Sequence, residues 1–133
     1  HRSLAEKLGA VWTGTLNDNP PAKLHSIVNF TPAGPTVPAA MRLLDRGGTQ
    51  ALAGIYMTPI PEMDYQEHLY WEKTLRSVAN ATRRDGEELL ALAAEIPIKT
   101  TVETYGLKEA NKVLLRLKKS EIDGAAVLVV REK

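Results

Sequence analysis

The sequence predicts an α/β protein whose first part contains parallel β-strands. Segments rich in strand formers alternate with segments of helical periodicity along most of the 133 residues. A helix that connects two strands of one sheet usually makes them run parallel, and residues 25–56 read as such a strand, helix and strand. From about Lys99 the pattern changes, which indicates a small α+β segment that forms a second unit.

The composition is that of an ordinary globular chain with one moderate core. Apolar residues make up 44% and charged residues 25%, and the formal net charge is +1. So small a net charge directs the chain toward neither nucleic acid nor a membrane, and we expect neither as a partner. Cysteine is absent, which excludes disulfides and thiolate metal sites and fits a cytoplasmic location.

The first residues read as the end of a helix. Leu4 and Leu8 share one helical face, and Gly9 suits the left-handed residue that closes a helix. The sequence starts within this element and without methionine, so we expect a fragment of a longer polypeptide. Residues 10–13 then form a short β-prone run, and residues 17–23 contain loop-forming asparagine, aspartate and proline.

A strand, a helix and a second strand follow. Residues 25–30 are a short run of strand formers bounded by turn residues. A helix is expected from Pro38, because proline loses nothing in a first turn, and Gly47 and Gly48 should end it. Residues 49–55 are mostly small and apolar, as a strand covered on both faces requires.

The alternation continues through the middle of the chain. Prolines exclude regular structure from residues 56–64, residues 65–73 suit a short amphipathic helix, and residues 74–80 suit a third strand. The next helix has two candidate caps, Thr82 and Asp85, and Pro97 should end it. Its apolar stripe consists of Leu89, Leu92 and Ile96.

The last third predicts strand, helix and strand. Residues 99–105 are β-rich, and residues 124–130 are a continuous apolar run of the kind that lies inside a sheet. Between them lies the clearest amphipathic helix of the chain, with apolar residues at steps of three and four: Leu107, Ala110, Leu114 and Leu117.

Residues that directly follow the predicted strands are candidates for a ligand site. In an open parallel sheet, backbone groups just past the carboxyl ends of the strands face the crevice where ligands bind. Glycine and small residues let a ligand approach the backbone closely, although they are also ordinary turn residues. The candidates are Thr31, Pro32, Ala33 and Gly34 after the first strand and Gly54, Ile55 and Tyr56 after the second.

Two charged patterns have alternative interpretations. Asp64, His68 and Glu72 would share one face of a helix, which suits either a metal site or a solvated face with ion pairs. The basic run at 116–119 closes an amphipathic helix, where cations favour the carboxyl end; nucleic-acid binding is the alternative. Nucleophile motifs and glycine-rich phosphate loops are absent, so the sequence predicts no catalytic residue of its own. Because a solvated face is the commoner interpretation of Asp64, His68 and Glu72, we assign no metal ligand.

Residues 5–14, 44–55, 81–95 and 102–130 together resemble the carboxyl-terminal portion of the zinc-dependent medium-chain alcohol dehydrogenases. The most specific part is a V-E-T-Y-x-L-x-E-A-N-x-x-L-x-x-L pattern, which begins at Val102 and is followed by a short turn and an apolar strand. The resemblance covers nearly the whole chain, in order and with the family's spacing.

The resemblance implies a partial Rossmann fold, in which the first strands of a doubly wound parallel sheet are missing. Residues 1–96 would be the later part of the nucleotide-binding domain, and residues 97–133 the return of the chain to the catalytic domain. The parent enzyme would transfer hydride between NAD(P) and an alcohol–aldehyde pair at a zinc site. The alternatives are a zinc-free reductase of the quinone or enoyl type from the same superfamily, and a non-catalytic self-associating module.

The resemblance also implies roles for the candidate residues. The first two loops would line the nicotinamide and its ribose, and a third loop after residues 74–77 would present its backbone to the carboxamide. This third loop comprises Val78, Ala79 and Asn80. The sequence departs from the family at Ala81, where glycine is common, and at Ala125, where an arginine usually helps to hold phosphate.

The family's remaining parts would precede His1. They include the glycine-rich turn, the residue that selects NAD or NADP, and the zinc ligands, so the chain alone is expected to be inactive and to bind neither NAD(P) nor zinc tightly. In the strand order 3-2-1-4-5-6, the chain would supply strands 3, 4, 5 and 6. The apolar edge of strand 4 would then be covered by the missing part or by another chain, and a homo-oligomer is expected near residues 74–80. The substrate and the choice between NAD and NADP stay open.

Overall fold

A computed structural model describes residues 2–96 and 98–130. Its contacts divide the chain into two compact units, the first from Leu4 to Thr82 and the second from Arg83 onward. Helix α1 (Arg2–Lys7) begins the described chain, and Gly9 follows with a φ of 99°, as the sequence predicts for a helix end. No helix among the described residues is both long and apolar enough to cross a membrane.

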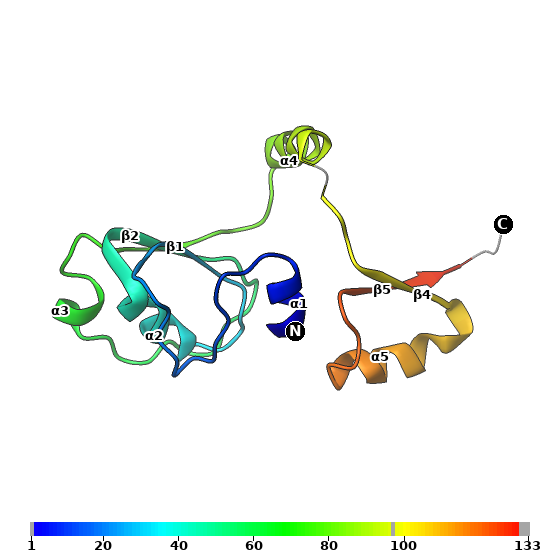
Figure 1. The fold of residues 1–133 in the computed structure, drawn as a ribbon, viewed down its shortest axis with the longest axis horizontal. Helices are drawn as coiled ribbons and strands as arrows, with labels where there is room; N and C mark the ends of the chain where they lie inside the picture. Colours follow the sequence, from blue (N-terminus) through cyan, green and yellow to red (C-terminus); the bar gives the residue numbers. More distant parts are fainter. Residues whose placement is uncertain (1, 97, 131–133) are drawn as a thin grey trace. The chain divides into compact units, whose positions relative to one another are not determined.

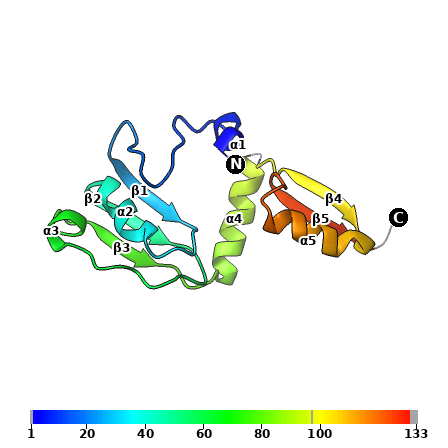
Figure 2. The same ribbon diagram turned by 90° about the horizontal axis from the view of Figure 1, so that it is seen from below.

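The first unit is built on a three-stranded parallel sheet (Figures 1 and 2). Strands β1 (Leu24–Asn29), β2 (Leu44–Leu52) and β3 (Thr74–Ser77) lie in the order β1-β2-β3. Helix α2 (Thr36–Leu43) connects the first two strands, and a short helix α3 (Tyr65–His68) precedes the third. The parallel strands and their helical connections confirm the predicted α/β class.

Helix α2 covers one face of this sheet. Val37 and Met41 of the helix and Leu44 at the start of β2 are at most 2% exposed and form the core of the unit. On the other face, Val28 is 59% exposed and its register partner Ala51 is only partly buried. The prediction that residues 49–55 are covered on both faces is therefore wrong within the described residues.

Three expectations about this unit are corrected by the structure. Residues 10–13 form no strand, because no described strand lies beside them to supply ladder hydrogen bonds. Helix α3 has four residues and does not extend over residues 65–73. Gly47 and Gly48 do not end a helix, since α2 ends at Leu43 and both glycines lie inside β2.

The two glycines instead accompany an irregularity in the pairing of β1 with β2. Leu24 is aligned with Leu44, but Ser26 is aligned with Thr49, so β2 contains extra residues at this point. Gly47 has a φ of 68°, a conformation that glycine adopts without strain, and its N–H donates to the carbonyl of Trp71 at 2.9 Å.

The second unit contains a β-α-β arrangement. Helix α4 (Arg83–Glu95) comes first, and strands β4 (Val102–Gly106) and β5 (Ala125–Val129) then pair in parallel through helix α5 (Ala110–Lys118). A 3-10 turn (Leu107–Glu109) leads into α5. All four predicted elements are present, and the start of α4 immediately follows Thr82, one of its two predicted caps. Pro97, which we expected to end α4, lies outside the described residues.

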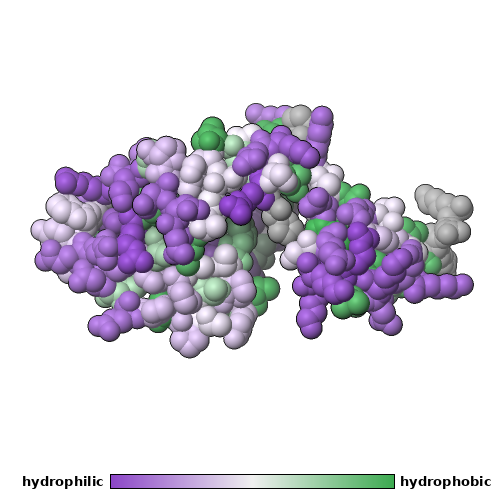
Figure 3. All heavy atoms as spheres, turned by 60° about the horizontal axis from the view of Figure 1, so that its bottom comes forward, coloured by the Kyte–Doolittle hydropathy of each residue, from purple (hydrophilic) through white to green (hydrophobic). Residues whose placement is uncertain are grey.

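The contacts divide the chain near residue 82, whereas the family resemblance places a domain boundary between residues 96 and 97. The difference concerns α4, in which no residue is buried. Its apolar residues Leu89, Leu90 and Leu92, together with Ile96 directly after it, are between 48% and 73% exposed, and Figure 3 shows apolar side chains at the surface of the molecule. Which domain of a longer enzyme contains α4 therefore stays a prediction.

Candidate functional site

The nine residues proposed as a cofactor site follow the carboxyl ends of three neighbouring strands. Residues 31–33 come after β1, residues 54–56 after β2 and residues 78–80 after β3. Because these strands are parallel and adjacent, the structure brings the three loops to one edge of the sheet, which we call the carboxyl rim. Backbone bonds continue past the strand ends, from Ala53 N–H to the Asn29 carbonyl and from Val78 N–H to the Leu52 carbonyl, each at 2.9 Å.

Asn29 fixes the first loop of the carboxyl rim. Its side chain is buried, and its Oδ1 accepts hydrogen bonds from the backbone N–H and from the hydroxyl of Thr31 at 2.9 and 2.8 Å. Its Nδ2 donates to Thr36 Oγ1 at 3.0 Å, and that hydroxyl donates to the Ala33 carbonyl at 2.6 Å. A buried amide that bonds both ends of the loop leaves it little freedom to move.

The sequence analysis missed Asn29 and Thr36. Two signals could have identified them: a polar side chain at the end of an apolar strand, and a threonine at the start of the following helix. Because Thr36 is also the first residue of α2, the network ties the loop to the helix that covers the sheet.

The first loop is also held by residues that follow the second loop. Thr58 donates its N–H to the Pro32 carbonyl at 2.8 Å, and its hydroxyl accepts from the Gly34 N–H at 2.8 Å. A Cβ atom on Gly34 would lie 2.1 Å from the Pro59 carbonyl oxygen. The approach of the two segments therefore requires glycine at position 34.

Around Gly54 the carboxyl rim is open and polar. A Cβ atom built there would meet three carbonyl oxygens, those of Tyr56 at 3.4 Å, Thr31 at 3.7 Å and Phe30 at 3.9 Å. These distances are ordinary contacts, so the absence of a side chain leaves space beside acceptors that come from two loops. A ligand with amide N–H or hydroxyl donors fits such a set of acceptors.

Large apolar side chains lie next to this polar position. Ile55 is 99% exposed, Tyr56 68% and Val78 51%. In the third loop, Asn80 has a φ of 60°, a left-handed conformation that asparagine tolerates better than most residues. The carboxyl rim thus combines backbone acceptors with exposed apolar surface, a combination that suits a flat, partly polar ligand.

The structure does not group Asp64, His68 and Glu72. The Asp64 carboxylate accepts from the Glu67 N–H at 2.8 Å and caps α3, while Glu72 lies beyond the end of that helix with a φ of 57°. His68 is 4% exposed, and its Nδ1 lies 2.7 Å from the Asp64 carbonyl oxygen. Neither the metal site nor the solvated face is formed.

Over residues 2–96 and 98–130 no group of three histidine, cysteine, aspartate or glutamate side chains could hold a metal ion. The described residues therefore do not fit a zinc ion.

Arg116, in the basic run, contacts other residues of its own unit. Its guanidinium donates to the Tyr105 hydroxyl at 2.6 Å and lies 3.7 Å from the Glu103 carboxylate. Tyr105 in turn donates to Glu103, and this bond lowers the pKa of Glu103 and raises that of Tyr105. These contacts join β4 to α5, and the Arg116 guanidinium is engaged in them.

Curated proteins similar to the chain are alcohol dehydrogenases. It is 41% identical over 129 residues to a probable alcohol dehydrogenase, AdhA, of Mycobacterium tuberculosis. This alignment covers 97% of the chain and 37% of that protein. It is 30% identical over 137 residues to an alcohol dehydrogenase of Geobacillus stearothermophilus, with 97% of this chain and 40% of that protein covered. The chain thus spans about two fifths of the length of these relatives. No family model matches it.

Solved structures share its fold. The crystal structure of AibC matches 84% of this chain and 33% of its own, with a TM-score of 0.68 and 22% identity. A putative alcohol dehydrogenase from Sinorhizobium meliloti 1021 matches 80% of this chain and 30% of its own, with a TM-score of 0.65 and 17% identity. By its sequence the chain is similar to part of these alcohol dehydrogenases over 97% of its own length, and its fold agrees with that of the solved structures.

Proposed function

We propose that the chain is part of an NAD(P)-dependent alcohol dehydrogenase and supplies the surface that holds the nicotinamide end of the cofactor. The observation that carries this proposal is the convergence of three loops on one edge of a parallel sheet, with three carbonyl oxygens around the open position at Gly54. The identity of 41% to a probable alcohol dehydrogenase supports the reaction class. The substrate would be a small alcohol or the corresponding aldehyde.

In this proposal each part of the carboxyl rim has a task. The carbonyl oxygens of Phe30, Thr31 and Tyr56 accept hydrogen bonds from the carboxamide or from ribose hydroxyls. The exposed side chains of Ile55 and Val78 contact the ring and exclude water from it. The cofactor supplies the hydride chemistry when it is bound, and the chain's contribution is to orient it.

The zinc ion of the proposed parent enzyme would need ligands from residues other than those described here. The chain has no cysteine, and the described residues contain no cluster of metal-ligating side chains. A zinc-free reductase of the same superfamily is therefore the alternative. Metal analysis of the purified full-length protein separates the two: about one zinc per active site supports the alcohol dehydrogenase, and a metal-free active enzyme supports the alternative.

We further propose that the parent enzyme is a cytoplasmic homo-oligomer that associates near β3. This strand is one of the two outer strands of the described sheet, and Thr74, Arg76 and Ser77 on it are exposed. An outer strand leaves one row of backbone N–H and carbonyl groups for pairing with a second copy.

The test is a kinetic comparison on the full-length protein that carries this sequence. Turnover with NAD or NADP and a series of small alcohols is expected. In Gly54→Val the branched side chain should fill the space between the carbonyl oxygens and raise KM for the cofactor about tenfold or more, because the binding contacts are lost. Gly86→Val, in α4, is the matched control, because no atom lies within 4 Å of a Cβ built there.

Two results would count against the proposal: no turnover of any alcohol with either cofactor, or an unchanged cofactor KM in Gly54→Val. The isolated chain gives a further check. It should bind NADH and NADPH only weakly, and micromolar affinity in a fluorescence titration would contradict the view that it holds only one end of the cofactor.

A further inference from the structure

Positively charged side chains gather at the edge of the sheet opposite the carboxyl rim. Lys23 directly precedes β1, Arg42 lies two residues before β2, and Lys73 directly precedes β3. Because the strands are parallel, their amino ends share one edge. Arg46, in the irregular part of β2, completes this group, which we call the amino-edge cations.

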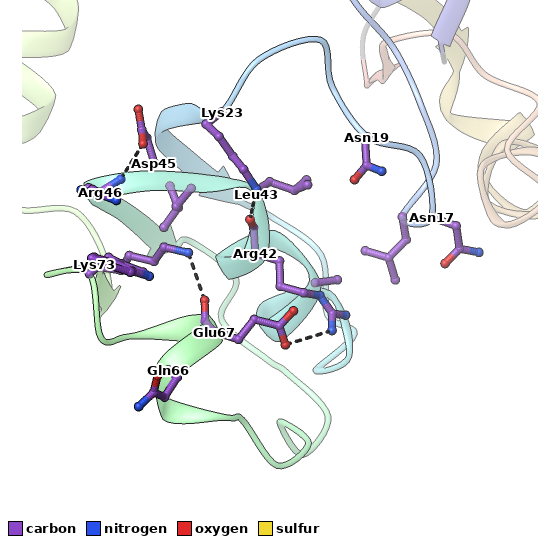
Figure 4. A pocket seen from close by; sticks show the side chains of 14 residues that line it. Asn17, Asn19, Lys23, Arg42, Leu43, Asp45, Arg46, Gln66, Glu67 and Lys73 are labelled. Atoms are coloured by element: carbon purple, nitrogen blue, oxygen red, sulfur yellow. Dashed lines mark hydrogen bonds and ion pairs between the residues drawn. The ribbon is translucent and has the colours of Figure 1, made fainter.

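The amino-edge cations line a cavity of about 700 Å³ (Figure 4). Two carboxylates, Asp45 and Glu67, also line it, so the charged groups have an excess of two positive charges. The size falls within the range of small-molecule sites, roughly 300–1,000 Å³. The wall also contains apolar side chains, among them Leu16, Ala39, Leu43, Leu44 and Trp71.

The two lysines are held close to each other by the end of α2. Lys23 Nζ donates to the Arg42 carbonyl at 2.8 Å, and Lys73 Nζ donates to the carbonyls of Met41 and Glu67 at 2.9 and 3.1 Å. Figure 4 shows both ammonium groups at the cavity. These bonds use one N–H of Lys23 and two of Lys73, and an ammonium group has three, so each lysine can donate to a further acceptor.

Interaction with the carboxyl end of α2 explains the presence of one ammonium group, but not of both Lys23 and Lys73. The last carbonyls of a helix favour a positive charge nearby. A second ammonium group beside the first adds repulsion, and the charge of Lys23 helps to lower the pKa of Lys73, after the larger effect of desolvation. An anion that accepts from both ammonium groups would remove this repulsion.

The two arginines extend the polar wall, which also contains Asn17, Asn19 and Gln66. Arg42 lies 3.8 Å from the Glu67 carboxylate, and both side chains are about half exposed. The guanidinium carbon of Arg46 lies 4.2 Å from the centre of the Trp71 ring. Stacking fixes the plane of a guanidinium while its N–H groups stay at the edge of the stack, where they can donate to an anion.

We propose that the amino-edge cavity binds a small organic phosphate. The phosphate group lies between Lys23 and Lys73, and the organic part contacts Leu16 and Trp71. This site is distinct from the carboxyl rim, because it lies at the opposite, amino ends of the same strands.

The experiment is a calorimetric titration of the full-length protein with phenyl phosphate, and with phenol as the uncharged counterpart. Phenyl phosphate should bind, and its affinity should fall as salt is added. Lys23→Gln and Lys73→Gln should each weaken binding about tenfold or more, because a charge-assisted hydrogen bond is lost. Lys112→Gln, a 73% exposed lysine of the other unit, is the matched control and should bind as the parent does.

Glutamine can still donate to the helix carbonyls, so both variants should fold, and thermal unfolding checks this. If Lys73→Gln alone unfolds, Lys23→Gln decides the question. The proposal is overturned if phenol binds as tightly as phenyl phosphate, or if a folded lysine variant keeps the parent affinity. It is also overturned if saturating NAD(P)H displaces the probe, which would mean that the phosphate occupies the cofactor site.

Discussion

At the scale of single residues, the carboxyl rim depends on side chains that the sequence did not mark as functional. The place of the loop residues was predictable, because the carboxyl ends of adjacent parallel strands lie at the same edge of a sheet. Asn29 and Thr36 were not, because their role depends on which atoms the fold brings within hydrogen-bonding distance. The sequence analysis gave Gly34 as a residue beside which a ligand could approach the backbone, but the structure gives a different reason for this glycine, the close Pro59 carbonyl.

Gly34→Ala should destabilise the first unit. Its Cβ would lie 2.1 Å from a backbone oxygen, and relief of such a clash moves the chain at a cost of roughly 2 kcal/mol in the free energy of unfolding. Gly54→Ala is the control, since its Cβ meets only ordinary contacts of 3.4 Å and longer, and a change within about 0.5 kcal/mol is expected. Urea denaturation followed by tryptophan fluorescence reports on this unit through Trp71, and equal stabilities of the two variants would refute the clash.

At the scale of elements, local patterns identified most helices and strands. Helices α4 and α5 and strands β1, β3, β4 and β5 form close to where periodicity and turn residues predict them, whereas β2 begins at Leu44, inside the segment predicted as a helix. The errors come from contacts that are distant in sequence. Residues 10–13 have the composition of a strand but no described neighbour, and Gly47 and Gly48 join a strand because β2 pairs with β1 on both sides of them.

The junction of β4 with α5 should weaken in acid. The hydrogen bond from Tyr105 lowers the pKa of Glu103 from its usual value of 4.5. A pKa that is lower in the folded protein than in the unfolded chain stabilises the fold at pH values above the unfolded pKa. This stabilisation is lost as the pH falls from about 4.5 through the folded pKa. Hydrogen exchange of the β4 amides should therefore accelerate in this range.

Tyr105→Phe removes the bond and should flatten this dependence on pH. Tyr65→Phe, an exposed tyrosine of the first unit, serves as the control. If the exchange rates of the β4 amides in Tyr105→Phe keep the parent's dependence on pH, the hydrogen bond does not couple the Glu103 carboxylate to folding.

At the scale of the whole molecule, few of the apolar side chains that the structure describes are buried. The three-stranded sheet has β1 and β3 as open edges among the described strands. In β1, Val28 is 59% exposed, and Phe30, which follows this strand, is 74% exposed. The sequence resemblance predicted an unpaired apolar edge on one strand of this sheet, although the sheet has three described strands and not the four that the resemblance assigned to the chain.

The isolated chain should therefore self-associate. Apolar side chains next to an unpaired strand edge favour association with another copy. Light scattering should show a mass above that of a monomer, and Val28→Lys should reduce it. Val11→Lys is the control, since Val11 is fully exposed but lies outside the sheet. A stable, monodisperse monomer of the parent chain would contradict the expectation.

The irregular part of β2, where extra residues lie between Leu44 and Thr49, affects how such proteins can diverge in sequence. It adds residues to one strand while the pairing of Ser26 with Thr49 and of all later residues stays aligned. Insertions or deletions within it could therefore change the reach of Asp45 and Arg46 at one end of the sheet and leave the loops at the other end in place. The two opposite ends of one short strand could thus evolve separately, one as part of the proposed cofactor site and the other as part of the proposed phosphate site.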